Sequence, residues 1–522
     1  MGTPRPPIAA SRVTDRTGPH SVQTWLITPA ESERDQRRAA SALASHGLVA
    51  GDRVALALPN SPALLAVVMG AVRTGIVPVL LNPTLLASEL EALVADARPG
   101  LVVRSPADLT DLVGAVDGRG AVDGRGAGAG GGSEVSGARV SGAGAGGARA
   151  GGAEAVGAGA GGARAGGARG VELAEVPLCR PMHYTSGTSG RPKGVWSGVM
   201  SQADARAVHD DEASTWGLGA ADTQLTCSPL YHSAAVRFSV QALLRGASLV
   251  LVERFDDQVV ADAISGFAVR SAFMVPTHLQ RLLALEPPPD LRGIRLLAHA
   301  GAPCPVPLKR QAIERFPPGS VWEFYGSTEG QFTVCPPADW LARPGTVGRA
   351  RAGRRLSTDA EGQIWCTVPP TATWSYWGDP AKTAAAWRGD AFTVGDLGGI
   401  DDDGFVWLSG RRDDLIISGG VNVYPVEVEQ ALGDVAGVDE IAVFGVPDED
   451  WGQRVCAALI GAATPAAVLE HARSVLAGYK RPKDVYVVDD LPRTPTGKVR
   501  RSALAAWLGL DGAAPEMRDG RR

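Results

Sequence analysis

The sequence contains few cysteines, and they are widely scattered. Only six occur in 522 residues, with no CxxC pair and no spacing typical of metal ligands. This arrangement excludes a cysteine-based metal site and a disulfide framework. It is typical of proteins kept in a reducing compartment.

Long apolar runs are also absent. No run approaches the roughly 18 consecutive apolar residues that a membrane helix needs. The first residues, MGTPRPPIAASRVTD, are polar and proline-rich and contain no apolar signal core, and Pro6 stands where a myristoylation signal requires Ser or Thr. These features predict a cytoplasmic protein without a membrane span.

The sequence has no excess of basic residues. Lys and Arg number 51 against 56 Asp and Glu, which gives a formal net charge of −5. Nucleic-acid-binding domains usually carry a basic footprint, so we expect no nucleic-acid partner. Binding of small anions is not excluded, because backbone N–H groups and a few Lys or Arg can form an anion site locally.

Bulky apolar residues are almost missing between residues 114 and 170. This segment is built from Gly, Ala, Arg and a few acids, and the string GAGAGGARAGGA occurs at 142–153 and again at 157–168. Such a composition cannot offset the entropy of ordering, which predicts a disordered insertion. A GxGxxG match at 142–147 is attributed to chance in this repeat, since no strand precedes it and no helix follows.

The rest of the chain alternates between short apolar runs and helical stretches, and it is too long for one core. Runs typical of buried strands lie at 52–59, 76–82, 246–253, 271–276 and 294–301, and a helix is expected over 61–73. This alternation predicts an α/β fold with mostly parallel sheets. From Gly410 onward the elements become smaller, which indicates a domain boundary near Arg411–Asp414, and the end of the chain resembles a frayed tail.

The segment Tyr184–Gly194 has the sequence YTSGTSGRPKG. Its glycines and hydroxyl side chains can present hydrogen-bond donors to phosphate oxygens, with Lys193 as a point charge. It is not a Walker A loop, because Pro192 interrupts that pattern. The alternative is a flexible surface turn. The residues expected at phosphate are Thr185, Ser186, Gly187, Thr188, Ser189, Gly190 and Lys193.

This loop resembles the phosphate loop of the adenylate-forming superfamily, and four further segments follow in the order of that family. They are YGSTEG at Tyr325–Gly330, VGD at Val394–Asp396, GRRDDLIISGG at Gly410–Gly420 and PRTPTGK at Pro492–Lys498. The resemblance covers about residues 20–508 except the insertion, and it points to the AMP-binding acyl-CoA synthetase and fatty-acid–CoA ligase branch. It implies an N-terminal AMP-binding domain over 1–410, a small mobile α+β lid domain over 411–509 and a disordered tail over 510–522.

The resemblance also assigns catalytic roles. Lys498 would bridge the substrate carboxylate and the α-phosphate, and Thr328 would hydrogen-bond that phosphate. Glu329 would hold Mg²⁺, a hard ion that prefers carboxylate and phosphate oxygens. These groups suit the reaction, because attack of a carboxylate on phosphorus brings two anions together. The alternatives are a solvated turn lysine and a surface acid.

Nucleotide contacts are implied for a second set of residues. Asp396 would accept hydrogen bonds from both ribose hydroxyls, and Val394 departs from the Thr that the family usually has there, which leaves local detail open. Arg411 would also contact the nucleotide. Tyr325 has the alternative role of core packing. The residues expected around adenine are Gly301, Ala302, Pro303, Tyr325 and Gly326.

His232, in PLYHSAAV (229–236), matches the position where related CoA ligases place an aromatic residue or His beside the substrate carboxylate; a structural histidine is the alternative. The segment has no carboxylate to pair with an α-ammonium group, and an unpaired buried charge costs several kcal/mol. The acid is therefore not expected to be an α-amino acid. Phe273–Thr277, His299 and Val236 are expected to line a mostly apolar acyl pocket.

The family's second half-reaction implies further roles. Asp413 matches the hinge of the lid, and Gly419 and Gly420 would line a narrow tunnel for coenzyme A. The predicted activity is an ATP-dependent acyl-CoA synthetase with ATP, Mg²⁺ and coenzyme A. The alternatives are a ligase that loads an acyl-carrier protein, a catalytically inactive binding protein, and a luciferase-like oxygenase.

Overall fold

The computed structural model describes residues 22–114, 171–185, 192–411, 414–418, 421–448, 451–493 and 498–510. The predicted insertion beyond Gly114 lies outside the described residues, as does the predicted tail after Leu510. Ser186–Gly190 of the expected phosphate loop, the expected hinge residue Asp413 and the expected tunnel residues Gly419 and Gly420 also lie outside them.

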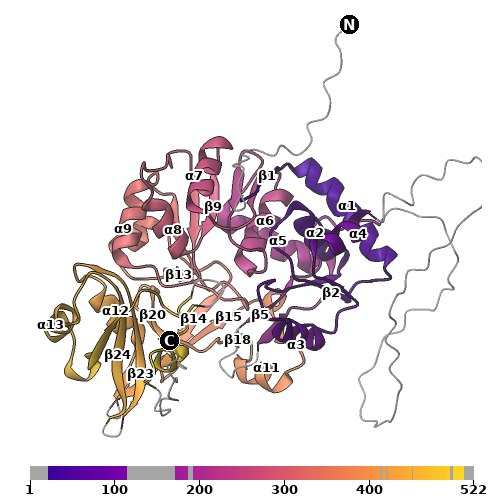
Figure 1. Cartoon of the computed structure of the whole chain (residues 1–522). Helices are drawn as coiled ribbons and strands as arrows, with labels where there is room; N and C mark the ends of the chain where they lie inside the picture. Colours follow the sequence, from indigo (N-terminus) through magenta and orange to yellow (C-terminus); the bar gives the residue numbers. More distant parts are fainter. Residues whose placement is uncertain are drawn as a thin grey trace, which may run out of the picture.

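A first six-stranded sheet forms the upper part of the molecule in Figure 1, where its strands β1 and β9 are labelled. Strand β1 pairs antiparallel with β8, and the other neighbours in this sheet are parallel. In spatial order the strands are β1 (Thr24–Ile27), β8 (Ser248–Val252), β7 (Thr223–Thr226), β9 (Ser271–Met274), β10 (Leu296–His299) and β11 (Val321–Glu323).

A second six-stranded sheet is parallel over four strands and ends in an antiparallel pair. In spatial order its strands are β16 (Ser375–Tyr376), β6 (Lys193–Trp196), β5 (Met182–Thr185), β3 (Val77–Leu80), β2 (Arg53–Leu56) and β4 (Leu101–Val103). The hairpin between β5 and β6 contains the expected phosphate loop, and Thr185 pairs with Lys193 at its base.

Helices fill the space between the two sheets and cover their outer faces. Buried side chains of α1 (Pro29–Ser45), α2 (Pro62–Thr74) and α6 (Ser233–Leu244) share one core with residues of β2 and β8. Helices α7 (Asp257–Gly266), α8 (Pro276–Leu283) and α9 (Val306–Arg315) pack on the far side of the first sheet, and α3 (Ala87–Ala97) on the far side of the second. Helix α4 (Pro106–Gly114) packs against α1, and α5 (Gln202–Trp216) against α6.

The sequence of α2 explains its central place. Ser61 caps it by accepting a hydrogen bond from the backbone N–H of Leu64, Pro62 begins it, and Gly75 ends it with a φ of 78°. Apart from Arg73 and Thr74 in its last turn, the helix is apolar on every side, which suits burial between two sheets rather than at a surface.

Smaller antiparallel elements follow. A four-stranded sheet contains β14 (Arg355–Thr358), β15 (Ile364–Thr367), β18 (Ala391–Phe392) and β17 (Trp387–Arg388). Two-stranded pairs are formed by β12 (Thr333–Val334) with β13 (Arg349–Ala350), and by β19 (Asp396–Ile400) with β20 (Val406–Arg411). Short helices lie at Pro337–Ala342 (α10), Pro370–Ala372 (η1) and Pro380–Ala386 (α11).

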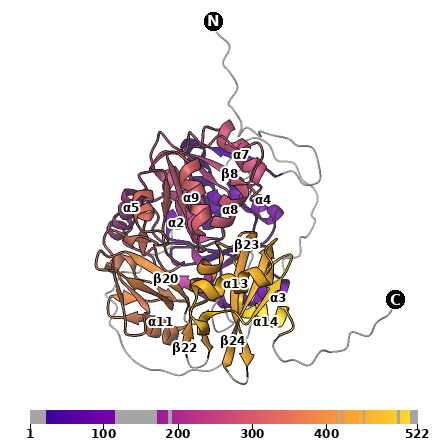
Figure 2. The ribbon, with the colours of Figure 1, turned by 90° about the vertical axis from the view of Figure 1, so that its left-hand side faces the viewer.

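The C-terminal part gathers at one side of the larger body, with β24 and α13 labelled in both views (Figures 1 and 2). Its five-stranded sheet has its own apolar core. The elements are β21 (Ile416–Ser418), β22 (Val421–Val423), α12 (Pro425–Leu432), β23 (Val438–Asp448), β24 (Gly452–Gly461), α13 (Pro465–Val475), η3 (Gly478–Lys480), β25 (Asp484–Val487) and α14 (Arg501–Trp507). The predicted domain boundaries themselves remain predictions.

The predicted fold class is confirmed. Each run predicted as a buried strand contains a strand, and the helix predicted over 61–73 is α2. Parallel pairs dominate both large sheets, as the alternation of strands and helices indicated. Among the described helices, none combines the length and apolarity needed to cross a bilayer.

Candidate active site

Several of the expected site residues follow the carboxyl ends of the parallel strands in the first sheet. His232 lies in the segment after β7, Gly301 follows β10, and Tyr325 follows β11. Ligands of open α/β sheets bind at this edge, because the loops after parallel strands converge there. Gly301 has a φ of 96°, a left-handed conformation that favours glycine at the turn where the chain leaves β10.

Tyr325 and Asp396 form a buried pair. The Tyr325 hydroxyl donates a hydrogen bond of 2.6 Å to Oδ2 of Asp396, and the ring of Tyr325 stacks on Phe332 with centroids 4.6 Å apart. The expected core-packing role of Tyr325 is therefore present, and the same side chain orients Asp396. Across the β19–β20 hairpin, the backbone of Arg411 is the partner of Asp396.

The segment Tyr325–Gly330 forms a tight turn. The backbone N–H of Ser327 donates to the carbonyl of Gly330 at 2.8 Å, and a Cβ at Gly326 would lie 2.8 Å from that carbonyl oxygen. Glycine is thus required at 326 by a close backbone approach. The turn places Thr328 and Glu329 side by side on the wall of a cavity.

Glu329 is held by a side chain from the second sheet. The Tyr376 hydroxyl donates to Oε1 of Glu329 at 2.9 Å, and the Lys193 ammonium lies 4.7 Å from the centre of the Tyr376 ring. Burial lowers the pKa of Lys193, and the nearby ammonium of Lys382 in α11 lowers it further. The ammonium groups of Lys193 and Lys382 repel each other beside the Glu329 carboxylate, and a bound phosphate would offset this repulsion. Sequence reasoning missed Tyr376 and Lys382, since neither lies in a recognisable motif.

The buried carboxylate at 329 fits a magnesium ion. The described residues contain no group of three or more His, Cys, Asp or Glu that could hold a metal by themselves. Mg²⁺ is usually bound through one or two carboxylates together with substrate phosphates, so one well-placed glutamate beside a phosphate site meets its needs.

His232 is the N-cap residue directly before α6 and is partly buried. Its ring lies edge-on to Tyr231 with centroids 4.5 Å apart, and its Nε2 is buried without a hydrogen-bond partner in the described part of the chain. Burial lowers the pKa of His232 to about 3, with further contributions from His183, Lys498 and His278. The positive charge of Lys498, from the C-terminal part, thus lies close enough to act on the histidine at the sheet edge.

Three histidines that are buried or partly buried make stability depend on pH. Burial lowers the pKa of His183 to about 4, and that of His232 and His278 to about 3. Their stabilising contribution is complete above the unfolded value of about 6.5 and is lost as the pH falls, because the unfolded chain binds protons first. We expect the free energy of unfolding to fall by about 1.6 kcal/mol per histidine between pH 6.5 and 5.

Denaturant unfolding at pH 7, 6 and 5 checks this expectation. The variant His183→Gln keeps a donor for the carbonyl of Tyr231, which the His183 Nδ1–H reaches at 3.0 Å, and it removes the titrating group. Its stability should depend less steeply on pH than that of the wild type. An equal slope for both proteins would contradict the assignment.

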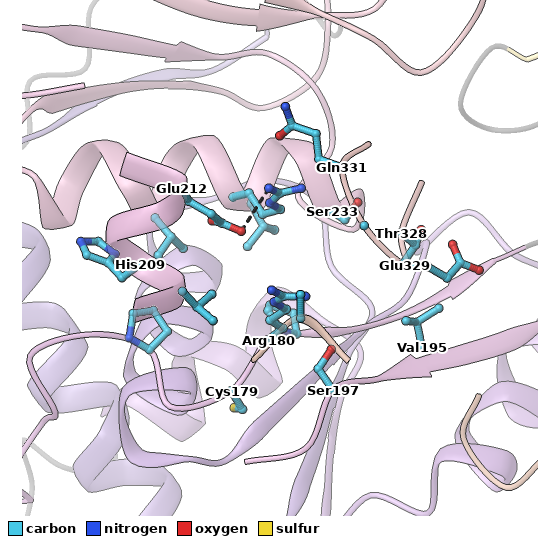
Figure 3. Close-up of a pocket in the computed structure, with 18 of the residues that line it drawn as sticks. Cys179, Arg180, Val195, Ser197, His209, Glu212, Ser233, Thr328, Glu329 and Gln331 are labelled. Carbon is cyan, nitrogen blue, oxygen red and sulfur yellow. Dashed lines mark ion pairs between the residues drawn. The ribbon is translucent and has the colours of Figure 1, made fainter. Parts of the chain in front are cut away.

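The cavity beside Thr328 and Glu329 is mixed in character. Its volume is about 90 Å³, and Figure 3 shows its walls. Val236 and Phe392 contribute apolar surface, whereas Arg180, Glu212 and three further arginines contribute charge. Isolated arginines give no motif, so sequence reasoning missed this charged side.

The expected apolar pocket is only partly present. Val236 lines the cavity and Phe273 stacks on Phe238 with centroids 5.4 Å apart, but His299 does not line this cavity. His299 is fully buried instead, and its Nε2 contacts the Lys309 ammonium. A carboxylate oxygen of Glu323 lies close to both of these groups. The mostly apolar acyl pocket therefore remains a prediction, and this cavity adds a charged side that the sequence did not indicate.

Models of known protein families match the chain in two places. The model described as AMP-binding enzyme matches residues 10–364, and the one described as AMP-binding enzyme C-terminal domain matches residues 427–498. An indoleacetate–CoA ligase of Aromatoleum aromaticum is 34% identical over 341 residues, which are 61% of this chain and 65% of that ligase, just under two thirds of its length. A long-chain-fatty-acid–CoA ligase of Mycobacterium tuberculosis is 30% identical over 496 residues, 92% of each chain.

Solved structures agree with these matches. The o-succinylbenzoate coenzyme A synthetase of Bacillus subtilis, in complex with ATP and magnesium ion, is similar with a TM-score of 0.71 and 25% identity. The match covers 91% of this chain and 94% of that one. With a family model over more than half of its residues and a relative matched over 92% of both lengths, the chain belongs to the family of AMP-binding enzymes.

Proposed function

We propose that this enzyme activates a carboxylic acid as its acyl-adenylate and transfers the acyl group to the thiol of coenzyme A. The chain is an AMP-forming acid–CoA ligase. The observation that carries this function is the buried Tyr325–Asp396 pair at the sheet edge where His232 also lies, near enough to Lys498 of the C-terminal part for its charge to lower the pKa of the histidine. CoA ligases among its relatives, with different named acids, support the reaction class and leave the acid open.

The nucleotide binds along the carboxyl edge of the first sheet. Adenine lies against Gly301, Ala302 and Pro303 and beside Tyr325. Asp396, oriented by the Tyr325 hydroxyl at 2.6 Å, accepts hydrogen bonds from the ribose hydroxyls. Arg411 follows on the adjacent strand and also contacts the nucleotide. The phosphates lie between the loop at Thr185–Gly190 and the two ammonium groups of Lys193 and Lys382.

In the first half-reaction, a carboxylate oxygen of the acid forms a bond to the α-phosphorus, and the bond to pyrophosphate breaks. Lys498 and the Thr328 hydroxyl stabilise the negative charge that gathers between the reacting groups. His232 stays neutral because its pKa is low, so it orients the carboxylate without adding charge. Glu329 would hold Mg²⁺, which would supply positive charge at the phosphates.

In the second half-reaction, the thiol sulfur attacks the acyl carbonyl carbon, a thioester forms and AMP leaves. The C-terminal lid, residues 411–509, turns about Asp413 for this step and brings Gly419 and Gly420 to the pantetheine arm. The N-terminal AMP-binding domain, residues 1–410, keeps the adenylate in place. The alternative acceptor is the phosphopantetheine thiol of an acyl-carrier protein.

The test is release of pyrophosphate with ATP, Mg²⁺ and a panel of carboxylic acids, each with coenzyme A, with a carrier protein bearing phosphopantetheine, or with no thiol. We expect acid-dependent pyrophosphate release, and a thioester only with coenzyme A. If a thioester formed only on the carrier protein, the acceptor would be the carrier protein and not coenzyme A. Failure of every acid to promote pyrophosphate release or exchange would contradict the function.

A further inference from the structure

The cavity beside Thr328 and Glu329 has an excess of positive charge on one side. Four arginines line it, and they come from separate parts of the chain: Arg180 precedes β5, Arg237 belongs to α6, and Arg351 and Arg354 lie between β13 and β14. The neighbouring carboxylates are Glu212 and Asp211 of α5. Four guanidinium groups against two carboxylates leave a surplus of positive charge in this part of the structure.

Three of these arginines have carboxylate partners. Arg237 pairs with Glu212 at 3.0 Å, and Asp211 pairs with Arg351 at 2.9 Å and with Arg354 at 3.5 Å. A structural role in holding α5 to the body explains Arg351 well, since it also donates to the carbonyl of Asp211 and to the Thr215 hydroxyl, both at 3.0 Å.

Arg180 is not explained by such a role. Within the described residues its guanidinium makes no hydrogen bond and no ion pair, although it lies near enough to Glu212 for each to shift the other's pKa. Burial lowers the pKa of Arg180, and the charges of Arg237 and Arg354 lower it further. Arg180 is half-buried at the wall of the cavity, and an incoming anion would supply the charged partner that its guanidinium group lacks there.

Two other arginines of the cluster also have donor atoms without a hydrogen-bond partner among the described residues. The side chain of Arg351 is 2% exposed, and its Nε, like that of Arg237, is buried without a hydrogen-bond partner in the described part of the protein. Guanidinium groups present several N–H donors in a fixed plane, which matches the geometry of a carboxylate. The unused donors and the surplus charge therefore suit the same kind of ligand.

The cluster shares its cavity with Thr328 and Glu329, which are proposed to act at the phosphates during activation of the acid. Figure 3 shows Arg180 and Glu212 directed into the cavity, with Thr328 and Glu329 on another side. A smaller neighbouring cavity, lined by Trp216, Phe238 and Phe324, shares Glu212 and Arg237 with it. An acid with its reacting carboxylate at Thr328 would thus have its far end among arginines and aromatic rings.

We propose that the acid activated by this enzyme is a dicarboxylic acid, whose second carboxylate binds the arginine cluster through Arg180. The inference rests on the proposed function and names the substrate class of the same site. The guanidinium group of Arg180 forms charge-assisted hydrogen bonds to the second carboxylate and sets the distance between the two carboxyl groups that the enzyme accepts.

The first experiment uses the wild-type enzyme and matched pairs of acids. Pyrophosphate release is measured with monocarboxylic and α,ω-dicarboxylic acids of equal length, and with an aromatic acid with and without a second carboxylate. We expect a higher kcat/KM for the dicarboxylic member of at least one pair. A preference for the monocarboxylic member in every pair would overturn the proposal and leave the CoA-ligase function standing, whereas no release with any acid would overturn both.

The second experiment compares Arg180→Gln, Arg180→Lys and the control Arg206→Gln, an exposed arginine of α5 that pairs with Glu175 outside the cavity. For the preferred dicarboxylic acid, Arg180→Gln should lower kcat/KM by about 30-fold or more, mainly through KM, and Arg180→Lys should recover part of the loss. The matched monocarboxylic acid should be unaffected. Equal losses for both acids would show a merely structural role for Arg180 and would overturn the proposal.

Discussion

Replacing Lys498 with alanine is expected to abolish adenylate formation and to spare the thioester step. Lys498 is exposed in the structure, yet its charge contributes to lowering the pKa of His232 at the sheet edge. This ammonium is the group from the C-terminal part that is proposed to offset the repulsion between two reacting anions. Its loss should reduce acid-dependent pyrophosphate release by roughly 10²–10³-fold or more, as for a removed transition-state donor.

The two half-reactions separate this role from a general loss of structure. Thioester formation from supplied acyl-adenylate and coenzyme A should proceed nearly as in the wild type, because Lys498 is proposed to act only in the first step. Lys483→Ala is a matched control, since this exposed lysine lies over the Trp451 ring at 4.6 Å in the same part of the chain. If both half-reactions were lost equally in Lys498→Ala, the proposal that the lid uses one face for adenylation and another for thioester formation would be contradicted.

Glu329→Gln is expected to have the second largest effect. The amide keeps an oxygen that can accept the 2.9 Å hydrogen bond from the Tyr376 hydroxyl, so the turn should remain in place. It removes the charge that is proposed to hold Mg²⁺, and hard cations bind a neutral amide less well than a carboxylate. We expect kcat/KM for ATP to fall on the order of 10²-fold or more, with a higher Mg²⁺ concentration needed for half-maximal rate.

Tyr376→Phe is the comparison for this variant. It keeps the carboxylate of Glu329 and removes only one hydrogen bond, with a net cost of about 1 kcal/mol, or roughly fivefold in rate. Titration of pyrophosphate release against Mg²⁺ distinguishes the two variants. An unchanged Mg²⁺ dependence in Glu329→Gln would show that the ion is held elsewhere.

The motif segments indicated much of the site, because their chemistry depends on local backbone. Gly326 is required by a contact within its own turn, and Gly301 takes a left-handed φ where β10 ends. Backbone requirements of this kind are met by residues that are close in sequence, so they produce a recognisable sequence motif. The hydroxyl-rich loop and the alternation of apolar runs likewise predicted a phosphate site and the fold class before any tertiary contact was known.

Only the tertiary structure brought together groups that are far apart in the chain. The Tyr376 hydroxyl meets Glu329 from another strand, and Lys382 lies beside Lys193 across nearly two hundred residues. Arg180 meets Arg237 and Arg354 in one cavity although the net charge of the chain is −5. Local sequence determined the loops that suit a nucleotide, whereas packing decided which charges share a cavity, because charges act through distance in space and not through separation along the chain.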